Sequence, residues 1–520
     1  MTTAPEDVPS EVAEAAARIL APEIGLLADV DEALLGRALL AVAAGGAPPT
    51  TTVGGLVAEA AGQAGRITSA TVGRLLGRDA PAPIEVDPKD RRFADPTWQD
   101  NPLFFGLRQS YLAAAKLLAR AVDEAGTDPV TTEKARLAAG FLVDALAPTN
   151  FAATNPAVLK RAFETNGASL LAGLRNFADD LLHNQGRPRQ VDRAPFRVGE
   201  NLATTPAKVV YRSDLVEILQ YLPQTETVHA VPILMSPPWI NKYYVMDLAP
   251  ERSFIEWAVR RGHTVFAISY RNPDKTMSAV TMDDYLVDGP RTALDVISEI
   301  TGAPKVDIVG LCLGGALTTM TAAYLAATGD ERVNTITLLN TLLDYSEPGV
   351  LGVFTDEATV VKLERKLAKS GVLDGAAMAG TFDVLRANDL IFNYVVSNWL
   401  LGKQPPAFDI LAWNADSTRM PAAMHSFYLR SCYVENRLVN GTMELAGQRL
   451  NLKDVTSELY VVAAINDHIV PWESSYRTTQ VMPGEARFVL SSGGHIAGIV
   501  NPPNPKAWYL TAGDNPASAT

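Results

Sequence analysis

A single cysteine in a tight glycine turn is the residue of this chain best placed to do chemistry. Residues 307–316 read Asp-Ile-Val-Gly-Leu-Cys-Leu-Gly-Gly-Ala. The β-branched, apolar run at 306–309 predicts a buried parallel strand, and residues 317–327 predict a helix. Between them lies a G-x-C-x-G turn, the pattern of a nucleophile elbow with cysteine in the position that serine usually holds. The spacing therefore identifies Cys312 as a candidate nucleophile.

Three glycines around the turn support this interpretation. A nucleophile elbow is tight and strained, so small residues must flank the nucleophile, and Gly310 and Gly314 supply them. Gly315 lets the following helix pack close to the strand. The alternative is a buried structural cysteine beside a glycine turn. Because Cys312 and Cys432 are the only cysteines in the chain, a cysteine at the centre of this motif favours the catalytic interpretation.

An acid and a histidine follow Cys312 in the order that α/β-hydrolases use, which is nucleophile, then acid, then base. An apolar run at 459–465 predicts a strand, and Asp467 follows it at the carboxyl end, where catalytic groups of open α/β sheets collect. A further predicted strand at 487–490 leads into Ser-Ser-Gly-Gly and then His495. We therefore assign Asp467 as the acid and His495 as the base of a catalytic triad.

Other residues could take these two roles. The chain has six histidines, which are His183, His229, His263, His425, His468 and His495. The first four precede the elbow or fall in a predicted insertion. His468 is adjacent to the acid, so its side chain is expected to point elsewhere. Asp344, which follows a predicted strand at 335–339, is the main rival to Asp467.

The roles of the three residues follow from their chemical types. His495 would take the thiol proton of Cys312 and so activate the sulfur as a nucleophile. Asp467 would accept the other ring N–H of His495, which fixes the tautomer and orientation of the imidazole. The order of the residues therefore predicts a cysteine nucleophile that a histidine activates and an aspartate orients.

Two backbone N–H groups should form the oxyanion hole. One belongs to Leu313, the residue after the nucleophile. The other should come from the loop after an early strand, which is predicted at 230–235. Pro237 and Pro238 in this loop have no N–H to donate, and we assign the second donor to Ile240.

Beyond these residues, the chain resembles the single-subunit polyhydroxyalkanoate synthases. The similar strings run from about residue 90 to about 509 and are rich in uncommon residues. They are Phe-Ala-Asp-Pro-Thr-Trp at 93–98, Asn-Phe at 150–151, Thr-Asn-Pro at 154–156, Phe-Glu-Thr at 163–165, Pro-Pro-Trp-Ile-Asn-Lys-Tyr-Tyr at 237–244, Gly-His-Thr-Val-Phe at 262–266, Ser-Tyr-Arg-Asn-Pro-Asp at 269–274, Trp-Asn-Ala-Asp-Ser-Thr at 413–418, Asp-His-Ile-Val-Pro-Trp at 467–472, Gly-His-Ile-Ala-Gly at 494–498 and Asn-Pro-Pro at 501–503. One departure is Trp239, because many relatives have cysteine there, so this loop supplies no second thiol.

The resemblance implies a specific reaction. A (R)-3-hydroxyacyl-CoA would acylate the nucleophile with release of coenzyme A, and the hydroxyl of another unit would then attack, so that a polyester grows. The family's catalytic residues match Cys312, Asp467 and His495 in this sequence. The resemblance also implies a homodimer and a helical N-terminal domain that supports dimerisation and attachment to polyester granules. The string at 495–500 is similar to that of synthases that prefer short side chains.

Composition narrows the class of protein. A chain of 520 residues with 47% hydrophobic content suits two or three domains with a sizeable core. The net charge of −13 argues against a nucleic-acid partner. The first seven residues lack the basic start and apolar core of a signal peptide, and no apolar run reaches the roughly 18 residues of a membrane span. We therefore expect no transmembrane segment and a cytoplasmic protein, associated with polyester granules as the resemblance implies.

No metal-ligand spacing, P-loop or dinucleotide-binding glycine motif occurs in the chain, so we expect neither a bound metal nor a redox cofactor.

Hydrophobic periodicity divides the chain into three parts. Residues 1–83 are predicted to form a helical, partly flexible extension, with helical spacing at 12–20 and 34–44 and a Pro-containing linker at 79–83. We expect residues 84–200 to form a helical domain, which the resemblance identifies as the N-terminal synthase domain. Residues 201–520 form the catalytic domain, in which strands and helices alternate from about 207 and a helix at 283–300 leads into the elbow strand. From about 342 to 450 the alternation stops, which predicts a cap inserted over the active site.

The predicted fold is therefore an α/β-hydrolase fold with a helical cap insertion, preceded by a mainly helical N-terminal domain. A hydrolase with the same triad, acting as a thioesterase, esterase or polyester depolymerase, is the alternative enzyme. A third hypothesis is a granule-binding scaffold with a vestigial site. The intact set of Cys312, Asp467 and His495 argues against it. The residues that bind coenzyme A, and the choice of Asp467 or His495 as activator of the attacking hydroxyl, stay open at this stage.

Overall fold

The computed structural model describes residues 50–502, 504–513 and 515–517. The helices predicted at 12–20 and 34–44 lie outside these residues. The chain forms two compact units. The helical unit runs to Asp192 and also contains Ala376–Pro406, and the sheet unit contains Arg193–Gly375 and Ala407–Thr520.

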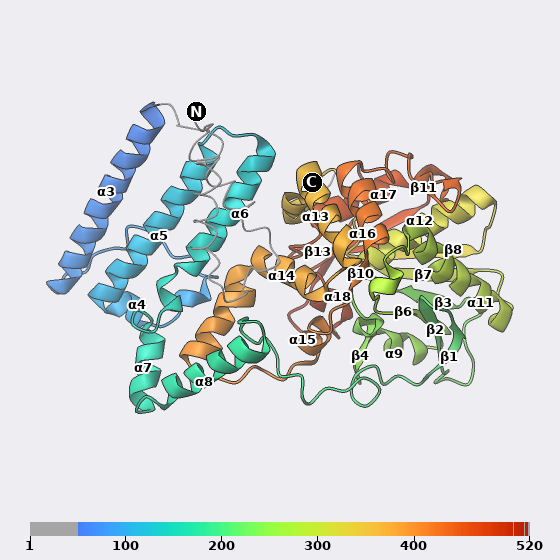
Figure 1. Cartoon of the computed structure of the whole chain (residues 1–520), viewed down its shortest axis with the longest axis horizontal. Helices are drawn as coiled ribbons and strands as arrows, with labels where there is room; N and C mark the ends of the chain where they lie inside the picture. Colours follow the sequence, from blue (N-terminus) through green and yellow to red (C-terminus); the bar gives the residue numbers. More distant parts are fainter. Residues whose placement is uncertain (1–49, 503, 514, 518–520) are drawn as a thin grey trace. The chain divides into compact units, whose positions relative to one another are not determined.

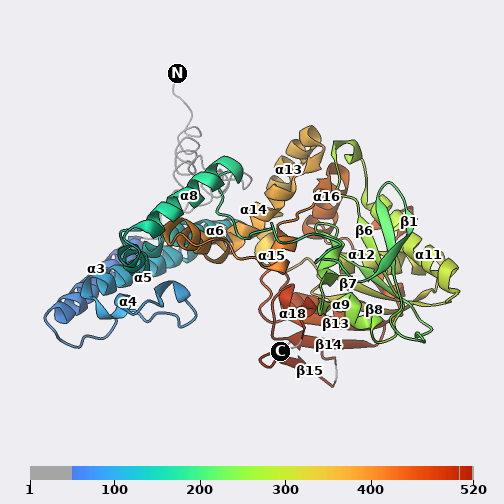
Figure 2. The same ribbon diagram turned by 90° about the horizontal axis from the view of Figure 1, so that it is seen from below.

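The helical unit consists of antiparallel and crossing helices, and α3 and α5 lie side by side (Figure 2). Its helices are α3 (Thr50–Leu75), α4 (Thr97–Asp100), α5 (Pro102–Asp123), α6 (Pro129–Ala145), α7 (Pro156–Glu164), α8 (Ala168–His183) and most of α14 (Gly375–Leu385), with the π-helices η7 (Asn388–Phe392) and η8 (Val395–Leu400). Small apolar clusters join neighbouring helices, such as Ile67 of α3 with Ala113 of α5.

Three of these helices begin with the same local device. An Asn or Asp caps the first turn and a proline follows it, at Asn101 for α5, Asp128 for α6 and Asn155 for α7. Each capping side chain accepts hydrogen bonds from backbone N–H groups that the helix leaves without an acceptor, and proline has the backbone angle that the first turn needs. These starts are therefore set by local sequence.

The helical unit also contains a segment from far along the chain. Residues 376–406 fall inside the predicted cap of 342–450, yet they pack with the N-terminal helices. The Nε1 atom of Trp399 donates a hydrogen bond to Asp180 of α8 at 2.9 Å. A Cβ atom on Gly173 of α8 would lie 2.7 Å from the carbonyl carbon of Trp399, so only glycine lets η8 come this close. The predicted cap is therefore divided between the two units.

The sheet unit is built on a nine-stranded sheet in the order β1-β2-β6-β3-β7-β8-β13-β14-β15. Its strands are β1 (Ala207–Arg212), β2 (Val216–Tyr221), β3 (Ile233–Ser236), β6 (Val265–Tyr270), β7 (Val306–Leu311), β8 (Val333–Leu339), β13 (Glu458–Ala464), β14 (Ala486–Ser491) and β15 (Tyr509–Thr511). The six strands from β6 to β14 are parallel, and the strands at both edges are antiparallel. The carboxyl ends of the parallel strands therefore meet at one edge, as catalytic groups in such sheets require.

Helices surround this sheet (Figure 1). They are α9 (Phe254–Val259), α10 (Met282–Leu286), α11 (Thr292–Thr301), α12 (Leu313–Thr328), α17 (Trp472–Val481) and α18 (Ala497–Val500). The single helix predicted at 283–300 is wrong. A π-helical turn at Val287–Arg291 separates α10 from α11, because Gly289 has a non-helical ψ of −113° and Pro290 cannot donate a backbone hydrogen bond.

Between β8 and β13 the sheet unit carries the remaining cap elements. They are the short helices α13 (Glu357–Ser370), α15 (Asp409–Asn414) and α16 (Ala422–Tyr428), the π-helix η9 (Leu429–Val434) and four two-residue strands, β9 to β12 (Val372–Leu373, Met420–Pro421, Glu444–Leu445 and Gln448–Arg449). Two further short strands, β4 (Asp247–Ala249) and β5 (Arg252–Ser253), pair with each other before α9. The alternation of strand and helix thus stops after β8, as predicted.

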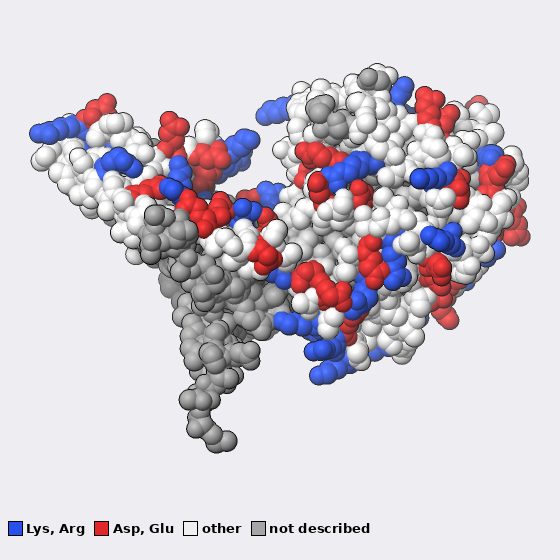
Figure 3. Space-filling model, turned by 90° about the horizontal axis from the view of Figure 1, so that it is seen from above, with Lys and Arg blue, Asp and Glu red and all other residues white. Residues whose placement is uncertain are grey.

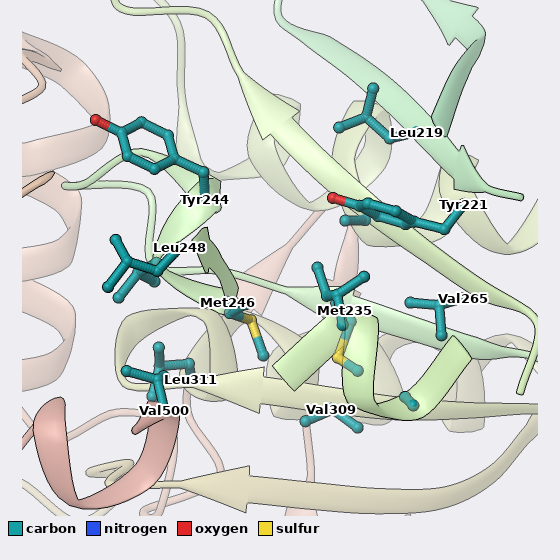
Figure 4. Packing of buried hydrophobic residues seen from close by; sticks show 14 of the residues in the cluster. Leu219, Tyr221, Met235, Tyr244, Met246, Leu248, Val265, Val309, Leu311 and Val500 are labelled. Atoms are coloured by element: carbon teal, nitrogen blue, oxygen red, sulfur yellow. The ribbon is translucent and has the colours of Figure 1, made fainter. Parts of the chain in front are cut away.

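A hydrophobic core joins the strands to the residues that follow them. It contains Met235, Val309, Leu311, Leu339 and Val500 among its buried members. Figure 4 shows Leu311 at the end of β7 beside Val500 in α18. The core therefore reaches the residues that stand directly before Cys312 and shortly after His495.

The surface of the sheet unit carries charges of both signs, which are interspersed on the face that Figure 3 shows. In the part of the chain that the structure describes, every helix is too short or too polar to cross a membrane.

One prediction concerns the buried His425 in α16, which is 3% exposed. Burial lowers the pKa of His425 to about 4, so the unfolded chain binds a proton there between pH 4 and 6.5 that the folded protein does not. Proton uptake by the unfolded chain therefore lowers the free energy of unfolding as the pH falls from 6.5 toward 4. The free energy of unfolding should therefore fall between pH 7 and pH 5, and in His425→Gln this fall should be smaller by about 2 kcal/mol. Urea unfolding at the two pH values gives the measurement. Equal losses in both proteins would contradict this.

Candidate active site

Cys312 lies in the turn between β7 and α12, in a strained backbone conformation. Its φ of 52° and ψ of −119° are unusual for a residue with a side chain. The surrounding hydrogen bonds hold this conformation. The N–H of Cys312 donates to the carbonyl of Leu339 at 2.8 Å, and its own carbonyl accepts from the N–H of Gly315 at 3.0 Å. The side chain is half-buried, so the sulfur stays accessible at the carboxyl edge of the sheet.

Close packing at this turn explains each of the three flanking glycines. A Cβ atom on Gly310 would lie 2.7 Å from the backbone nitrogen of Gly315. On Gly314 it would lie 2.6 Å from the carbonyl carbon of Pro237, and on Gly315 it would lie 2.9 Å from Thr341 Cγ2. No side chain fits at these distances, because neighbouring backbone excludes one at Gly310 and Gly314 and the Thr341 side chain excludes one at Gly315.

The structure brings His495 and Asp467 together. The Nδ1 atom of His495 lies 2.6 Å from Oδ2 of Asp467, and their side chains are 7% and 0% exposed. Asp467 follows β13 and His495 follows β14, two neighbouring parallel strands. The short distance and the burial therefore suit a base whose tautomer is fixed by a carboxylate.

Backbone donors hold the carboxylate of Asp467 in place. Its Oδ1 atom accepts hydrogen bonds from the N–H groups of Ile469 at 2.8 Å and Val470 at 2.9 Å. With Oδ2 turned to His495, both oxygens have partners. The rival acid, Asp344, is engaged elsewhere, because its carboxylate accepts hydrogen bonds from Ser346 and Asn436.

The electrostatics of His495 couple it to Cys312. Burial by itself would lower the pKa of His495, but negative charge on the Cys312 sulfur and hydrogen bonds with Asp467 and Cys312 together raise it to about 10. An imidazole in this environment readily holds a proton taken from the thiol. The three side chains can therefore act as nucleophile, base and orienting acid.

One predicted oxyanion donor, Leu313, directly follows Cys312 in the chain. Leu313 begins α12, so its N–H is one of the donors that a helix N terminus leaves without an intrahelical acceptor. Ile240 lies in the turn after β3. This loop is held against the elbow, since Ser236 Oγ donates to the carbonyl of Gly314 at 3.2 Å and Gly314 packs directly on Pro237.

Three tyrosines from the cap and from the segment after β8 form a cluster, and two of them, Tyr345 and Tyr433, interact electrostatically with Cys312. The ring of Tyr433 lies 4.7 Å from that of Tyr345 and 5.5 Å from that of Tyr428. Burial raises the pKa of Tyr345 well above its usual value, and the charge at Cys312 adds to this shift. Burial also raises the pKa of Cys432 to about 12, although a hydrogen bond with Tyr345 opposes the shift, so this second thiol is a poor nucleophile.

Sequence reasoning missed Asn340 and Thr341, which follow β8. Thr341 Oγ1 donates to the carbonyl of Cys312 at 3.2 Å, and the amide of Asn340 donates to the carbonyl of His495. Both residues lie at the carboxyl end of a central parallel strand, and this position is the sequence feature that could have identified them as site residues. Among the described residues, no three histidine, cysteine, aspartate or glutamate side chains are grouped as metal ligands.

Family models match most of the chain. Residues 235–502 match the alpha/beta hydrolase fold family, which confirms the predicted fold class. Residues 89–258 match the N-terminal region of poly-beta-hydroxybutyrate polymerase (PhaC). The two matches together cover residues 89–502.

Curated relatives match over most of their own length as well. The poly(3-hydroxyalkanoate) polymerase subunit PhaC of Rhizobium meliloti is 44% identical over 86% of this chain and 74% of that protein. The poly(3-hydroxyalkanoate) polymerase of Methylorubrum extorquens is 44% identical over 85% and 73%. Poly(3-hydroxyalkanoate) polymerase 1 of Ectopseudomonas oleovorans is 43% identical over 85% and 78%. A solved structure, alpha/beta hydrolase domain-containing protein 10 from mouse, is 15% identical over 56% of this chain and 90% of that chain, with a TM-score of 0.32.

The close contact at the elbow leads to a testable prediction. Gly314→Ala should displace the loop that carries Pro237, because the new methyl group has no room. We expect the unfolding free energy to fall by about 1–3 kcal/mol and alkylation of Cys312 by iodoacetamide to change in rate. Gly140→Ala in α6, where a Cβ atom meets nothing within 4 Å, is the matched control and should be neutral or slightly stabilising. Equal stability of the two variants would contradict the packing argument.

Proposed function

Since the chain belongs to the poly(3-hydroxyalkanoate) polymerase family, we propose that it polymerises (R)-3-hydroxyacyl-CoA through an acyl-cysteine at Cys312. The chain is an acyltransferase with an α/β-hydrolase fold, and polymerase activity implies a hydroxyacyl-CoA substrate and a polyester product. The observation that carries the assignment of the residues is the contact between His495 and Asp467 at the carboxyl edge of the sheet, beside Cys312.

In the first half-reaction, His495 takes the proton of the Cys312 thiol. The sulfur attacks the thioester carbonyl, and the resulting oxyanion accepts hydrogen bonds from the N–H groups of Leu313 and Ile240. The carbon–sulfur bond to coenzyme A breaks, and the imidazolium returns its proton to the leaving thiolate. An acyl-cysteine and free coenzyme A result.

In the second half-reaction, a hydroxyl of another hydroxyacyl unit attacks the acyl-cysteine and forms an ester. We propose that His495 takes the hydroxyl proton directly, with Asp467 orienting the ring. The surroundings of Asp467 support this choice, because its side chain is 0% exposed and both of its oxygens already have hydrogen-bond partners. The sulfur of Cys312 leaves and regains a proton.

A polymerase must favour the hydroxyl over water as the attacking group. A wall of aromatic rings begins near Cys312 at Tyr345 and Tyr433, whose pKa values are raised by burial and further by the charge at Cys312. It continues through Tyr428 to Trp239, and the rings of these two buried residues are in edge contact at 5.4 Å. Such a wall lowers the access of water to the thioester intermediate, for which hydrolysis is the competing fate.

The reaction predicts the behaviour of two cysteine variants. With (R)-3-hydroxybutyryl-CoA as substrate, we expect Cys312→Ala to lower the rate of coenzyme A release at least about 10³-fold and to abolish polymer, because the nucleophile is gone. Cys432→Ala is the matched control and should keep most of the activity, since this buried thiol is not used. Free thiol and insoluble polyester are both measured.

Two outcomes would overturn parts of this proposal. Polymer formation by Cys312→Ala would exclude Cys312 as the nucleophile. Release of coenzyme A by the unmutated protein with only soluble hydroxybutyrate as product would identify a thioesterase rather than a polymerase.

We further propose that the enzyme works in the cytoplasm as a homodimer attached to polyester granules. Exposed apolar side chains of the helical unit support attachment to an apolar polymer. In α7 and α8, Phe163 is 89%, Leu171 60%, Leu174 61% and Leu182 75% exposed. Exposed apolar side chains in one region mark a binding surface. The homodimer rests on the family resemblance.

Attachment through α8 is testable with charge substitutions. We expect the triple variant Leu171→Glu, Leu174→Glu and Leu182→Glu to leave the granule fraction, because carboxylates do not transfer to an apolar surface. A matched variant carries Val57→Glu, Leu75→Glu and Leu76→Glu in and after α3, where the side chains are similarly exposed, and should stay on the granules. Sedimentation of isolated granules gives the measurement, and equal retention of both variants would refute the role of α8.

A further inference from the structure

Asn340 occupies an unusual place in the fold, directly after β8 and before the cap. It is completely buried and has a φ of 45°, in the left-handed region that asparagine tolerates better than most residues. Its backbone N–H donates to the carbonyl of Val462 in the neighbouring strand β13 at 2.8 Å. The backbone of Asn340 is therefore fixed at the centre of the sheet's carboxyl edge.

The side chain of Asn340 reaches the loop that carries His495. Its Nδ2 atom donates a hydrogen bond to the backbone carbonyl of His495, and its Oδ1 atom has no hydrogen-bond partner among the described residues. The single interaction of this buried amide is therefore with the backbone of the proposed base. Burying an amide oxygen without a hydrogen-bond partner costs folding free energy. The hydrogen bond from Nδ2 to the carbonyl of His495 is the contact that offsets this cost.

The two neighbours of Asn340 hold the nucleophile. The carbonyl of Leu339 accepts the N–H of Cys312 at 2.8 Å, and the hydroxyl of Thr341 donates to the carbonyl of Cys312 at 3.2 Å. Three consecutive residues at the end of β8 thus contact the backbone of both Cys312 and His495. The distance between nucleophile and base is set through this one segment.

The loop around His495 needs an external support. It contains Gly493, Gly494 and Gly498, and glycine restricts the backbone least of all residues. Asp467 and Cys312 contact the imidazole ring, and Asn466 donates hydrogen bonds to the carbonyls of Ser492 and Gly493, but none of these contacts is made to the backbone of His495 itself. Asn340 adds an attachment at the carbonyl of His495, the point of the loop closest to the imidazole.

We propose that Asn340 is a positioning residue, which holds the imidazole of His495 at the distance from Cys312 that proton transfer requires. The proposal rests on the triad of the proposed function. It assigns the role to the side-chain amide rather than to the backbone conformation of Asn340.

Two substitutions separate these roles. Asn340→Gly keeps the positive φ and removes the amide, and Asn340→Asp keeps the shape but cannot donate to a carbonyl. Both should lower kcat about 10- to 100-fold with little change in KM, because proton transfer and not substrate binding is impaired. Alkylation of Cys312 by iodoacetamide at pH 7 should slow by a similar factor. Asn166→Gly in the helical unit, an asparagine with φ of 48°, is the matched control and should match the unmutated enzyme.

The outcomes of this experiment are distinguishable. Full activity of Asn340→Gly with a folded, stable protein would overturn the inference and assign Asn340 a backbone role only. His495→Gln is included as a reference variant. If His495→Gln does not slow alkylation and coenzyme A release, the proposed triad itself fails. If it slows both and the Asn340 variants slow neither, the triad stands and Asn340 is not a positioning residue.

Discussion

The rest of the site depends on the close approach of backbone to backbone around the elbow. Cys312 can adopt its strained conformation because Gly310 and Gly314 let the first turn of α12 pack on β7 and on the loop after β3, and Gly315 leaves room for Thr341 after β8. That packing presents the sulfur at the carboxyl edge of the sheet and places the N terminus of α12 beneath it. The same packing holds the start of the loop after β3, at Ser236 and Pro237, against Gly314 in the first turn of α12.

The charged and polar groups of the site are held by parallel strands rather than by one another alone. Asp467 and His495 follow two adjacent strands, and their ion-pair geometry is supported by backbone donors to the carboxylate. The hydrophobic core extends to Leu311 and Val500, which stand close in sequence to Cys312 and His495 (Figure 4). Rigid packing below the site therefore limits the movement of groups that must stay within hydrogen-bond distance.

The sheet and its order of catalytic residues were predictable because strong local patterns specify them. The strands at β7, β8, β13 and β14 are apolar runs that end in glycine or polar residues, and each lies within a few residues of its predicted position. The break between α10 and α11 was missed, although Gly289 and Pro290 signalled it. The sequence could not predict that the cap is divided between the two units. The contact that shows this division joins Gly173 and Trp399, which lie more than two hundred residues apart and meet only through tertiary packing.

The sequence by itself determined the fold class and the identity of Cys312, Asp467 and His495 as candidates, since motif spacing and strand order constrain them directly. Only the tertiary structure decided which acid meets His495, and it separated Asp467 from Asp344 through the pairing of β13 with β14. It also decided that Asn340 supports the His495 loop, a contact across 155 positions of the chain. Such contacts depend on the packing of strand ends, and no local pattern of residues records which side chains that packing brings together.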